Sequence, residues 1–536
     1  MSEAEQHQIG RVVCVSGSQV VAVIEPTAPG NAAVTPAPLH KGSLVKMRMP
    51  DTTIYGIVSG LSIPVPARAS AEGEVRLAEL ELIGEARTPD DDRPARFLRG
   101  ISAFPAVGDA VLPVGQQDLA CVYAPPAGST VRIGTVHLNR SQPVLISPDD
   151  LLGKHFAILG TTGCGKSCAV TLILQRILEG HANAHVLLLD PHNEYARAFA
   201  GTAEVLGPDS LQLPYWLLNS EEIASVVLGA NPQAPNGGAV AAILNELIAI
   251  AKTMLQRERY RGVHITVDTP LPYRLTDLNR LLDEVIGRLE KPESLTPYRW
   301  LKSRLEVLSA DSRFAFMFGG IAVQDNMVSI LSRLFRIPVG GKPVTIIDLS
   351  GVPSEVLNVV VSVLCRMTFD FALWSRGAQP MLLVCEEAHR YAPANSELGF
   401  EPTKEALGRI AKEGRKYGLS LCIVSQRPSE LAPDILSQCN TTFAFRLTSL
   451  RDQEIVRGVT TDTAYGLLDF LPSLGDAEAI VAGEGVALPL RIRFDSLPPE
   501  RRPLSGTARF SKCWQADSPD ETFVAEVVER WRRQQR

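Results

Sequence analysis

A short segment of this 536-residue sequence has the residues and the spacing of a phosphate-binding loop. The pattern G-x-x-x-x-G-K-[ST] is matched at every fixed position by Gly160, Thr161, Thr162, Gly163, Cys164, Gly165, Lys166 and Ser167. Glycines in such a loop let backbone N–H groups approach phosphate oxygens, and the N-terminus of the following helix favours the same negative charge. We expect Lys166 to contact the β- and γ-phosphates of a nucleotide and the Ser167 hydroxyl to bind Mg²⁺.

Two adjacent carboxylates, Glu386 and Glu387, follow the apolar segment 381–385. Neighbouring side chains at the end of a strand point in different directions. Glu386 can then reach the Mg²⁺ ion, while Glu387 can polarise an attacking water molecule. This pair favours transfer of the γ-phosphoryl group to water over transfer to a second substrate. The substrate of a kinase supplies its own nucleophile and does not need a second carboxylate to activate water. We therefore consider a P-loop kinase a weak alternative.

Two other polar positions follow apolar segments in the same way. Gln426 comes after the segment 419–424, where an amide is placed to sense the γ-phosphate or to orient a water molecule. Asp190 ends the segment 184–190, and we expect it, with Glu194, to belong to the network around Mg²⁺ or water.

A basic segment lies upstream of Gln426 and contains Arg409 and Arg415. Most runs of charge are solvated helix faces. An arginine that acts on the nucleotide of a neighbouring subunit would, however, also belong to an exposed element of this kind.

The elements that must position these residues alternate between strands and helices. Continuous apolar runs, typical of strands that are covered on both faces, cover 155–160, 184–190, 343–349, 381–385 and 419–424. Helical patterns lie between several of these runs, and one of them follows the glycine-rich loop directly. The alternation predicts an α/β fold with a mostly parallel sheet.

The remaining regions differ from this core. The first part of the chain consists of short alternating segments punctuated by proline and glycine, which predicts a β-barrel or sandwich without a helix. A long central region has helical patterns only and is expected to be an insertion. The predicted domains are an N-terminal β-barrel over 1–140, the first part of the core over 141–217, a helical insertion over 218–336, the second part of the core over 337–480 and a C-terminal brace over 481–536.

The last segment of the chain predicts an amphipathic helix. Ser518 and Glu521 have the spacing of a capping box, and apolar residues follow at helical intervals. The apolar positions are Phe523, Val524, Val527, Val528 and Trp531. Such a helix needs a surface to lie on, in this chain or in a neighbouring one.

Composition limits the class of protein. Hydrophobic residues make up 45% of the chain and charged residues 21%, which predicts a globular protein with large cores. Nine scattered cysteines without a CxxC pair indicate reduced thiols in a cytoplasmic protein. The polar, acidic first residues predict no signal peptide, and we expect no membrane segment because no run reaches about 20 apolar residues. A net charge of −6 argues against a generally basic surface, although it leaves room for nucleic acid in a local channel.

Taken together, these motifs resemble the HerA branch of the HerA/FtsK ATPases. The resemblance covers nearly the whole chain, and the motifs that carry it are Gly160 to Ser167, Asp190 to Tyr195, Glu386 to His389, Gly414 to Gly418 and Ser425 to Pro428. Cys164 is a modest departure, because serine is usual there. The resemblance implies a RecA-like P-loop NTPase core, an N-terminal barrel similar to the HAS-barrel, a helical insertion and a C-terminal brace.

The same resemblance implies roles for the candidate residues. The protein would form a homohexameric ring that hydrolyses ATP with Mg²⁺ at subunit interfaces and moves double-stranded DNA through a central pore. Glu386 would be the metal-side acid, Glu387 the catalytic base and Gln426 the sensor. Arg415 would be the arginine finger, with Arg409 as the alternative.

A hexameric ring could bind DNA although each chain carries a net negative charge. Six copies of a small basic patch would together line the pore with positive charge. The candidate pore segments are 390–404 and the part of the insertion that contains Arg257, Arg259 and Arg261. We leave the choice between them open.

HerA-type motors work with a partner, and the resemblance implies a NurA-like nuclease, or a sirtuin-like or other antiphage effector, that docks on the β-barrel. The chain has no nuclease motif outside the ATPase core. An alternative is an ATP-gated hexameric scaffold that assembles and activates such an effector without processive translocation. The acidic surface and the apolar terminal helix favour this alternative.

Overall fold

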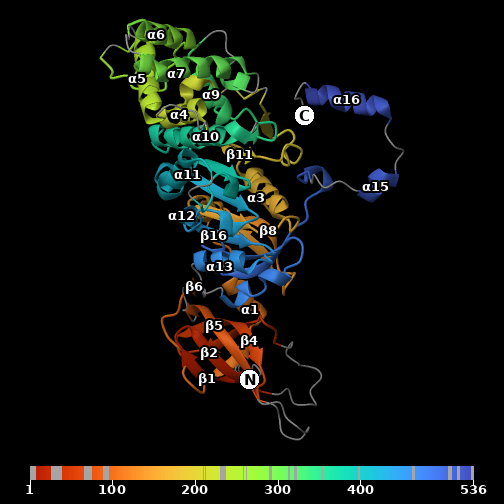
Figure 1. Cartoon of the computed structure of the whole chain (residues 1–536). Helices are drawn as coiled ribbons and strands as arrows, with labels where there is room; N and C mark the ends of the chain where they lie inside the picture. Colours follow the sequence, from red (N-terminus) through yellow and green to blue (C-terminus); the bar gives the residue numbers. More distant parts are fainter. Residues whose placement is uncertain are drawn as a thin grey trace. The chain divides into compact units, whose positions relative to one another are not determined.

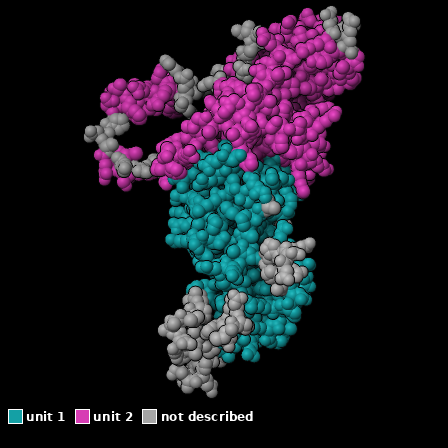
Figure 2. Space-filling model, turned by 180° about the vertical axis from the view of Figure 1, so that it is seen from behind, with its two compact units in different colours: residues 1–180, 420–497 teal, residues 181–419, 498–536 magenta. Residues whose placement is uncertain are grey.

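Figure 1 shows a computed structural model of the chain. The structure describes residues 8–25, 39–64, 75–87, 96–126, 128–208, 210–211, 213–229, 237–256, 259–260, 262–288, 292–311, 314–318, 323–352, 354–395, 399–460, 465–504, 510–515 and 520–532. The chain divides into two compact units, which are coloured separately in Figure 2. Unit 1 comprises residues 1–180 and 420–497, and unit 2 comprises residues 181–419 and 498–536.

Unit 1 begins with a closed β-barrel. Its strands are β1 (Gly10–Ser16), β2 (Gln19–Ile24), β3 (Leu44–Arg48), β4 (Thr52–Ser62), β5 (Arg76–Arg87) and β7 (Ala110–Pro113), and β6 (Phe97–Arg99) is added beside β5. The order β2-β1-β7-β3-β4-β5 closes because β5 also pairs with β2, antiparallel. Val12, Val45, Met47 and Ile54 fill the interior, each at most 1% exposed. The predicted barrel is confirmed, and its alternating pattern places every second side chain inside.

A short helix corrects the expectation that the N-terminal region is free of helices. Helix α1 (Gln116–Val122) follows β7, and Asp118 in its first turn holds it to the barrel. Lys46 donates a hydrogen bond to Asp118 at 2.6 Å, and the Tyr55 hydroxyl donates another at 3.1 Å. Lys46 is only 2% exposed, so its charge needs this carboxylate. Seven residues are too few for a clear helical period in the sequence.

The second part of unit 1 is a mixed sheet with the strand order β15-β10-β16-β17-β18-β8-β9. Its strands are β8 (Val131–Val136), β9 (Pro143–Ile146), β10 (His155–Leu159), β15 (Leu419–Ser425), β16 (Cys439–Ala444), β17 (Glu478–Gly483) and β18 (Leu490–Phe494). Strand β10 pairs in parallel with β15 and β16, whereas the strands beyond β16 are antiparallel. Its helices are α2 (Pro148–Leu152), α3 (Lys166–Gly180), α12 (Pro433–Leu436), α13 (Leu450–Val459) and α14 (Tyr465–Leu468).

Strand β8 lies within the range expected for the barrel, yet it pairs with β18 in the mixed sheet. Arg99 of β6 links the barrel to this sheet, because its guanidinium donates to the carbonyl groups of Gly483, Val486 and Ala487. The division into five domains stays a prediction.

Unit 2 contains a parallel sheet with the order β12-β13-β11-β14. Its strands are β11 (Val186–Asp190), β12 (Ala203–Leu206), β13 (Val344–Asp348) and β14 (Met381–Cys385). The crossover helix α10 (Ser354–Trp374) joins β13 to β14, and α11 (Glu401–Glu413) leads into the 3₁₀ turn η4 (Gly414–Tyr417). All five apolar runs of the sequence form buried strands, so the predicted α/β class is confirmed.

Between β12 and β13 lies a region of helices and loops. Its helices are α4 (Ser220–Leu228), α5 (Gly237–Gln256), α6 (Leu275–Arg288), α7 (Pro292–Ala310), α8 (Ala315–Phe318) and α9 (Met327–Leu334). Helix α4 begins with a capping box in which the Asn219 side chain accepts from the Glu222 N–H and Glu222 accepts from the Asn219 N–H. Helix α5 packs against α4, α6 and α7.

Two helices are long and apolar enough to cross a membrane by length and composition, α5 and the segment Val356–Trp374 of α10. The sequence analysis counted neither helix, because it required an uninterrupted apolar run; the absence of a membrane segment stays a prediction. The α10 segment is 72% buried, as in the core helix of a globular unit, and the α5 segment is 33% buried.

A buried lysine in this helical region makes its stability depend on pH. Burial lowers the pKa of Lys252 to about 8, and its ammonium donates to the carbonyls of Val267 and Thr269 at 2.6 and 2.7 Å. The unfolded chain binds this proton up to about pH 10.5, so stability should rise between about pH 8 and about pH 10.5, by about 3 kcal/mol in total. We expect the difference in thermal unfolding midpoint between the parent and Lys252→Met to grow in favour of the parent over this range. If this difference did not change with pH, the lowered pKa of Lys252 in the folded protein would be contradicted.

The last helices are α15 (Phe510–Gln515) and α16 (Glu521–Arg532). The N-terminus of α16 is capped by Asp520, whose carboxylate accepts from the N–H groups of Thr522 and Phe523 at 3.1 and 3.2 Å. Ser518, which we expected in this role, lies outside the described residues. The apolar face of α16 is exposed, and Trp531 is 79% accessible.

Candidate functional site

The glycine-rich loop of unit 1 connects β10 to α3 and has the backbone of a phosphate-binding loop. Gly160, Gly163 and Gly165 have positive φ angles of 155°, 80° and 110°, in the region that favours glycine. A Cβ at Gly160 would lie 2.5 Å from the Cβ of Phe445, so no larger residue fits there. The three glycines of the sequence pattern thus occupy positions whose backbone conformation or surroundings disfavour residues with a side chain.

Neighbouring strands brace this loop from both sides. The Gly160 N–H donates to the Ser425 carbonyl at 3.2 Å, and the Thr161 N–H donates to the Arg446 carbonyl at 2.9 Å. The Ala477 N–H donates to the Cys164 carbonyl at 3.1 Å. The loop is therefore held in shape by β15, by the exit of β16 and by the turn before β17.

Lys166 and Cys164 both point toward the interior of the loop. The Lys166 ammonium, 7% exposed, donates to the Thr161 carbonyl at 3.0 Å, and the Cys164 Sγ lies 2.8 Å from the same oxygen. Burial raises the pKa of the Cys164 thiol, so the neutral thiol packs here as a small side chain. Glycines that admit phosphate, a buried ammonium and the Ser167 hydroxyl at the helix start fit a nucleotide with Mg²⁺.

Gln426 lies next to this loop, as its proposed role requires. It follows β15, and its side-chain oxygen accepts a hydrogen bond from the Thr162 hydroxyl. The structure thus brings Gln426 together with the phosphate-binding loop inside unit 1.

The two carboxylates belong to unit 2 and follow β14. Glu386 and Glu387 are 3% and 7% exposed. The Glu386 N–H continues the ladder by donating to the Leu189 carbonyl at 3.3 Å. Glu387 then adopts a left-handed backbone, with φ 52° and ψ 44°. This conformation is costly for a residue with a side chain and is common at functional turns.

Each carboxylate has an aromatic or imidazole neighbour. The Tyr195 hydroxyl, fully buried, donates to Glu386 Oε2 at 2.5 Å. The His389 Nδ1 lies 3.2 Å from Glu387 Oε2. The sequence analysis gave neither Tyr195 nor His389 a role. Nothing in the sequence indicates the contact between Tyr195 and Glu386, because these residues are 191 positions apart.

Asp190 is fully buried and holds the loop that carries Tyr195. Its Oδ1 accepts from the His192 N–H at 3.2 Å, and its Oδ2 accepts from the Tyr195 N–H at 3.0 Å. Burial raises the pKa of Asp190, and these backbone hydrogen bonds oppose the shift. Asp190 therefore positions Tyr195, which in turn contacts Glu386. Its direct participation in nucleotide binding stays a prediction.

Tyr195→Phe removes one hydrogen bond from Glu386 without changing the shape of the side chain. We expect a reduction of about 10-fold in ATP hydrolysis, because the loss of one hydrogen bond to a charged group is equivalent to roughly 1.5–3 kcal/mol in the buried state. The measurement is the steady-state rate with saturating ATP at several Mg²⁺ concentrations. An unchanged rate would show that this hydrogen bond does not orient Glu386.

The two candidate arginine fingers differ in their surroundings. Arg415, on η4, is exposed, and no hydrogen bond or ion pair joins its guanidinium to any residue that the structure describes. Arg409, on α11, lies 3.9 Å from Asp370 and stacks over the Phe369 ring at 4.2 Å. Arg409 is thus engaged within its own chain, and this favours Arg415 as the residue available to a neighbouring subunit.

The predicted pore segments are only partly visible. Arg259 forms an ion pair with Asp325 at 3.1 Å, whereas Arg257 and Arg261 lie outside the described residues. In the segment 390–404, residues 396–398 are also outside them. The assignment of pore residues stays a prediction.

Comparison with known proteins finds similarity to HerA helicases. Residues 131–368 match the family model for the central domain of the helicase HerA. The chain is 27% identical over 420 residues to the DNA double-strand break repair helicase HerA of Pyrococcus furiosus, covering 71% of this chain and 72% of that one. It is 26% identical over 431 residues to the HerA of Sulfolobus acidocaldarius, covering 79% and 80%. Among solved structures, VirB4 of Thermoanaerobacter pseudethanolicus has a TM-score of 0.49 and 15% identity, covering 70% of this chain and 99% of that one.

The family match includes the phosphate-binding loop and the loop from Asp190 to Tyr195, and the two relatives match most of the chain. The barrel, the P-loop strand and helix, and the strand that ends in paired carboxylates agree with the architecture expected from the sequence motifs. The chain is therefore similar to HerA helicases over most of its length.

Proposed function

We propose that this protein is an ATP-driven motor that moves double-stranded DNA, with ATP hydrolysed at the interfaces of a homohexamer. It is a DNA-translocating ATPase. The observation that supports this proposal is that one chain, similar to DNA double-strand break repair helicases, contains both a braced phosphate-binding loop in unit 1 and two buried carboxylates at a strand end in unit 2.

Different residues of the chain bind the phosphates and Mg²⁺ during ATP hydrolysis. The loop from Gly160 to Ser167 binds the phosphates of ATP through its backbone N–H groups, and the Lys166 ammonium turns from the Thr161 carbonyl toward the β- and γ-phosphates. Ser167 and Glu386 would hold Mg²⁺, which would supply positive charge to neutralise the phosphates. Tyr195 fixes the orientation of Glu386.

Glu387 accepts the proton of the attacking water, and Gln426 orients that water or senses the γ-phosphate. A strained, buried carboxylate next to an imidazole supports this role for Glu387. Arg415 of one subunit stabilises the charge that develops on the nucleotide of the next subunit. Its exposure and its lack of a partner among the described residues support action in trans.

DNA cleavage would come from a separate protein, such as a NurA-like nuclease or a sirtuin-like or other defence effector docked on the barrel. A second candidate function is an ATP-gated scaffold that activates this effector without processive movement. The exposed apolar side chains of α15 and α16 favour it, because such faces serve in association. Phe510 and Trp514 on α15, and Phe523 and Trp531 on α16, are 48–80% accessible.

The test uses the purified full chain with double-stranded DNA that carries a third, triplex-forming strand. A translocase displaces the third strand in a reaction that requires ATP hydrolysis, and double-stranded DNA stimulates the hydrolysis. A protein that hydrolyses ATP but neither binds nor responds to double-stranded DNA, alone or with its effector, would exclude the motor. An effector that stays fully active on Glu387→Gln assemblies would support the scaffold instead.

A further inference from the structure

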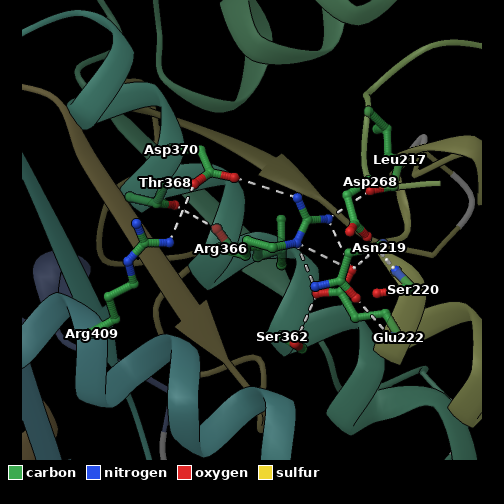
Figure 3. A network of polar contacts seen from close by, with 11 residues as sticks. Leu217, Asn219, Ser220, Glu222, Asp268, Ser362, Arg366, Thr368, Asp370 and Arg409 are labelled. Carbon is green, nitrogen blue, oxygen red and sulfur yellow. Dashed lines mark hydrogen bonds and ion pairs between the residues drawn. The ribbon is translucent and has the colours of Figure 1, made fainter. Parts of the chain in front are cut away.

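A network of charged side chains joins the helical region of unit 2 to α10 (Figure 3). Glu222 of α4 is fully buried, and its carboxylate accepts from the Arg366 guanidinium at 2.9 Å and from the Ser362 hydroxyl at 2.9 Å. Arg366 also donates to the Leu217 carbonyl at 2.6 Å. With the Asn219 N–H as a third donor, this buried carboxylate fixes the angle at which α4 meets α10.

The same network continues from α10 to α11. Arg366 lies 3.5 Å from Asp370, one helical turn further along α10. Asp370 in turn lies 3.9 Å from Arg409 of α11, whose guanidinium stacks over the ring of Phe369 at 4.2 Å. Arg409 is therefore held by a carboxylate and by an aromatic face, both on α10.

Phe369 has a second aromatic contact, with Tyr417. Their rings meet edge to face, with centroids 5.9 Å apart. Tyr417 belongs to η4, the short turn that begins where α11 ends and that carries Arg415. One phenylalanine thus touches both α11 and the turn that carries the expected arginine finger.

Arg415 itself has no side-chain partner among the residues that the structure describes, so its place depends on the backbone of η4. That backbone is tied to α10 through Arg409 and Tyr417. An arginine finger must lie within hydrogen-bonding distance of a transferring phosphoryl group, and a displacement of about 1 Å can reduce a rate about 100-fold. A rigid support is therefore expected for this turn.

We propose that Arg409, Phe369 and Tyr417 form a positioning relay that places Arg415, and that Glu222 and Arg366 connect this relay to the helical insertion. The inference rests on the proposed function, because it assumes that Arg415 acts on a neighbour's nucleotide. In this account Arg409 is a positioning residue and not an alternative finger. Movements of α4, at the start of the helical region, would reach the finger through Arg366.

The test is a double-mutant cycle on the full chain, with kcat and KM for ATP as readouts. We expect Arg409→Ala to lower kcat about 10-fold with KM within about 2-fold, and Arg415→Ala to lower kcat about 1,000-fold. In the Arg415→Ala background, Arg409→Ala should change kcat by less than about 2-fold, because it acts only through Arg415. The matched control is Lys412→Ala, which removes an exposed cation from the same helix.

The outcomes separate the relay from the proposed function. If Arg415→Ala leaves kcat unchanged, the arginine-finger assignment fails. If Arg415→Ala lowers kcat about 1,000-fold but Arg409→Ala lowers kcat by the same factor in both backgrounds, only the relay fails. If Arg409→Ala alone lowers kcat as much as Arg415→Ala and Arg409→Lys does not restore it, Arg409 is itself the finger and the relay is wrong.

Tyr417 provides a second route should Arg409→Ala fold poorly. Tyr417→Leu removes the edge-to-face contact with Phe369 and should lower kcat about 5- to 10-fold with little change in KM. Tyr417→Phe keeps the ring and should restore kcat. Equal activity of the leucine and phenylalanine variants would overturn the relay.

Discussion

Glu387→Gln is expected to abolish ATP hydrolysis while ATP still binds. Glutamine has nearly the same shape but cannot accept the proton of the attacking water. General-base catalysis contributes about 10²- to 10⁴-fold, so we expect kcat to fall at least about 100-fold. Glu387 is nearly buried in a left-handed turn beside His389, and the substitution keeps this packing.

Steady-state hydrolysis and binding of a fluorescent ATP analogue measure the two properties separately. Glu413→Gln is the matched control, because Glu413 is an exposed glutamate on α11. Retained turnover in Glu387→Gln would mean that another group activates the water. Loss of binding and turnover together would instead indicate a role for Glu387 in holding the nucleotide.

Lys166→Ala is expected to remove hydrolysis altogether, with a loss of at least about 100-fold in kcat/KM. Its ammonium is the only charge in the loop from Gly160 to Ser167 and would face the β- and γ-phosphates. The fold should tolerate the change, because the Thr161 carbonyl keeps its contact with Cys164.

The thermal unfolding midpoint of Lys166→Ala without nucleotide should therefore equal that of the parent, and the rise caused by added ATP should be lost. Lys342→Ala, which removes an exposed lysine, is the control. Normal turnover by Lys166→Ala would show that the nucleotide binds elsewhere.

Local motifs of this chain could be predicted from the sequence. The loop from Gly160 to Ser167 is contiguous, and its glycines occupy positions that require glycine. The apolar runs are long enough to identify as buried strands, and the paired carboxylates lie directly after one of them. Each of these features is determined by residues that are close together in the sequence, so a single sequence is enough to predict it.

Contacts between distant positions could not be predicted in this way. Tyr195 and Glu386 are separated by 191 positions, and nothing in either segment indicates their hydrogen bond. Arg409 looked like a free surface cation, and only the packing of α10 on α11 reveals its contacts with Asp370 and Phe369. Strand β8 was assigned to the barrel because its partner β18 follows some 350 positions later.

The central claim is that each nucleotide is hydrolysed between two subunits, and mixing two inactive variants tests it most directly. Lys166→Ala keeps Arg415 and loses the phosphate contact, whereas Arg415→Ala keeps the loop and loses the finger. In an equal mixture of co-assembled subunits, about one quarter of the interfaces would combine an intact loop with an intact Arg415. We expect hydrolysis to return to about that fraction of the parent rate. Co-assembled mixtures that stay as inactive as either variant alone would contradict the account.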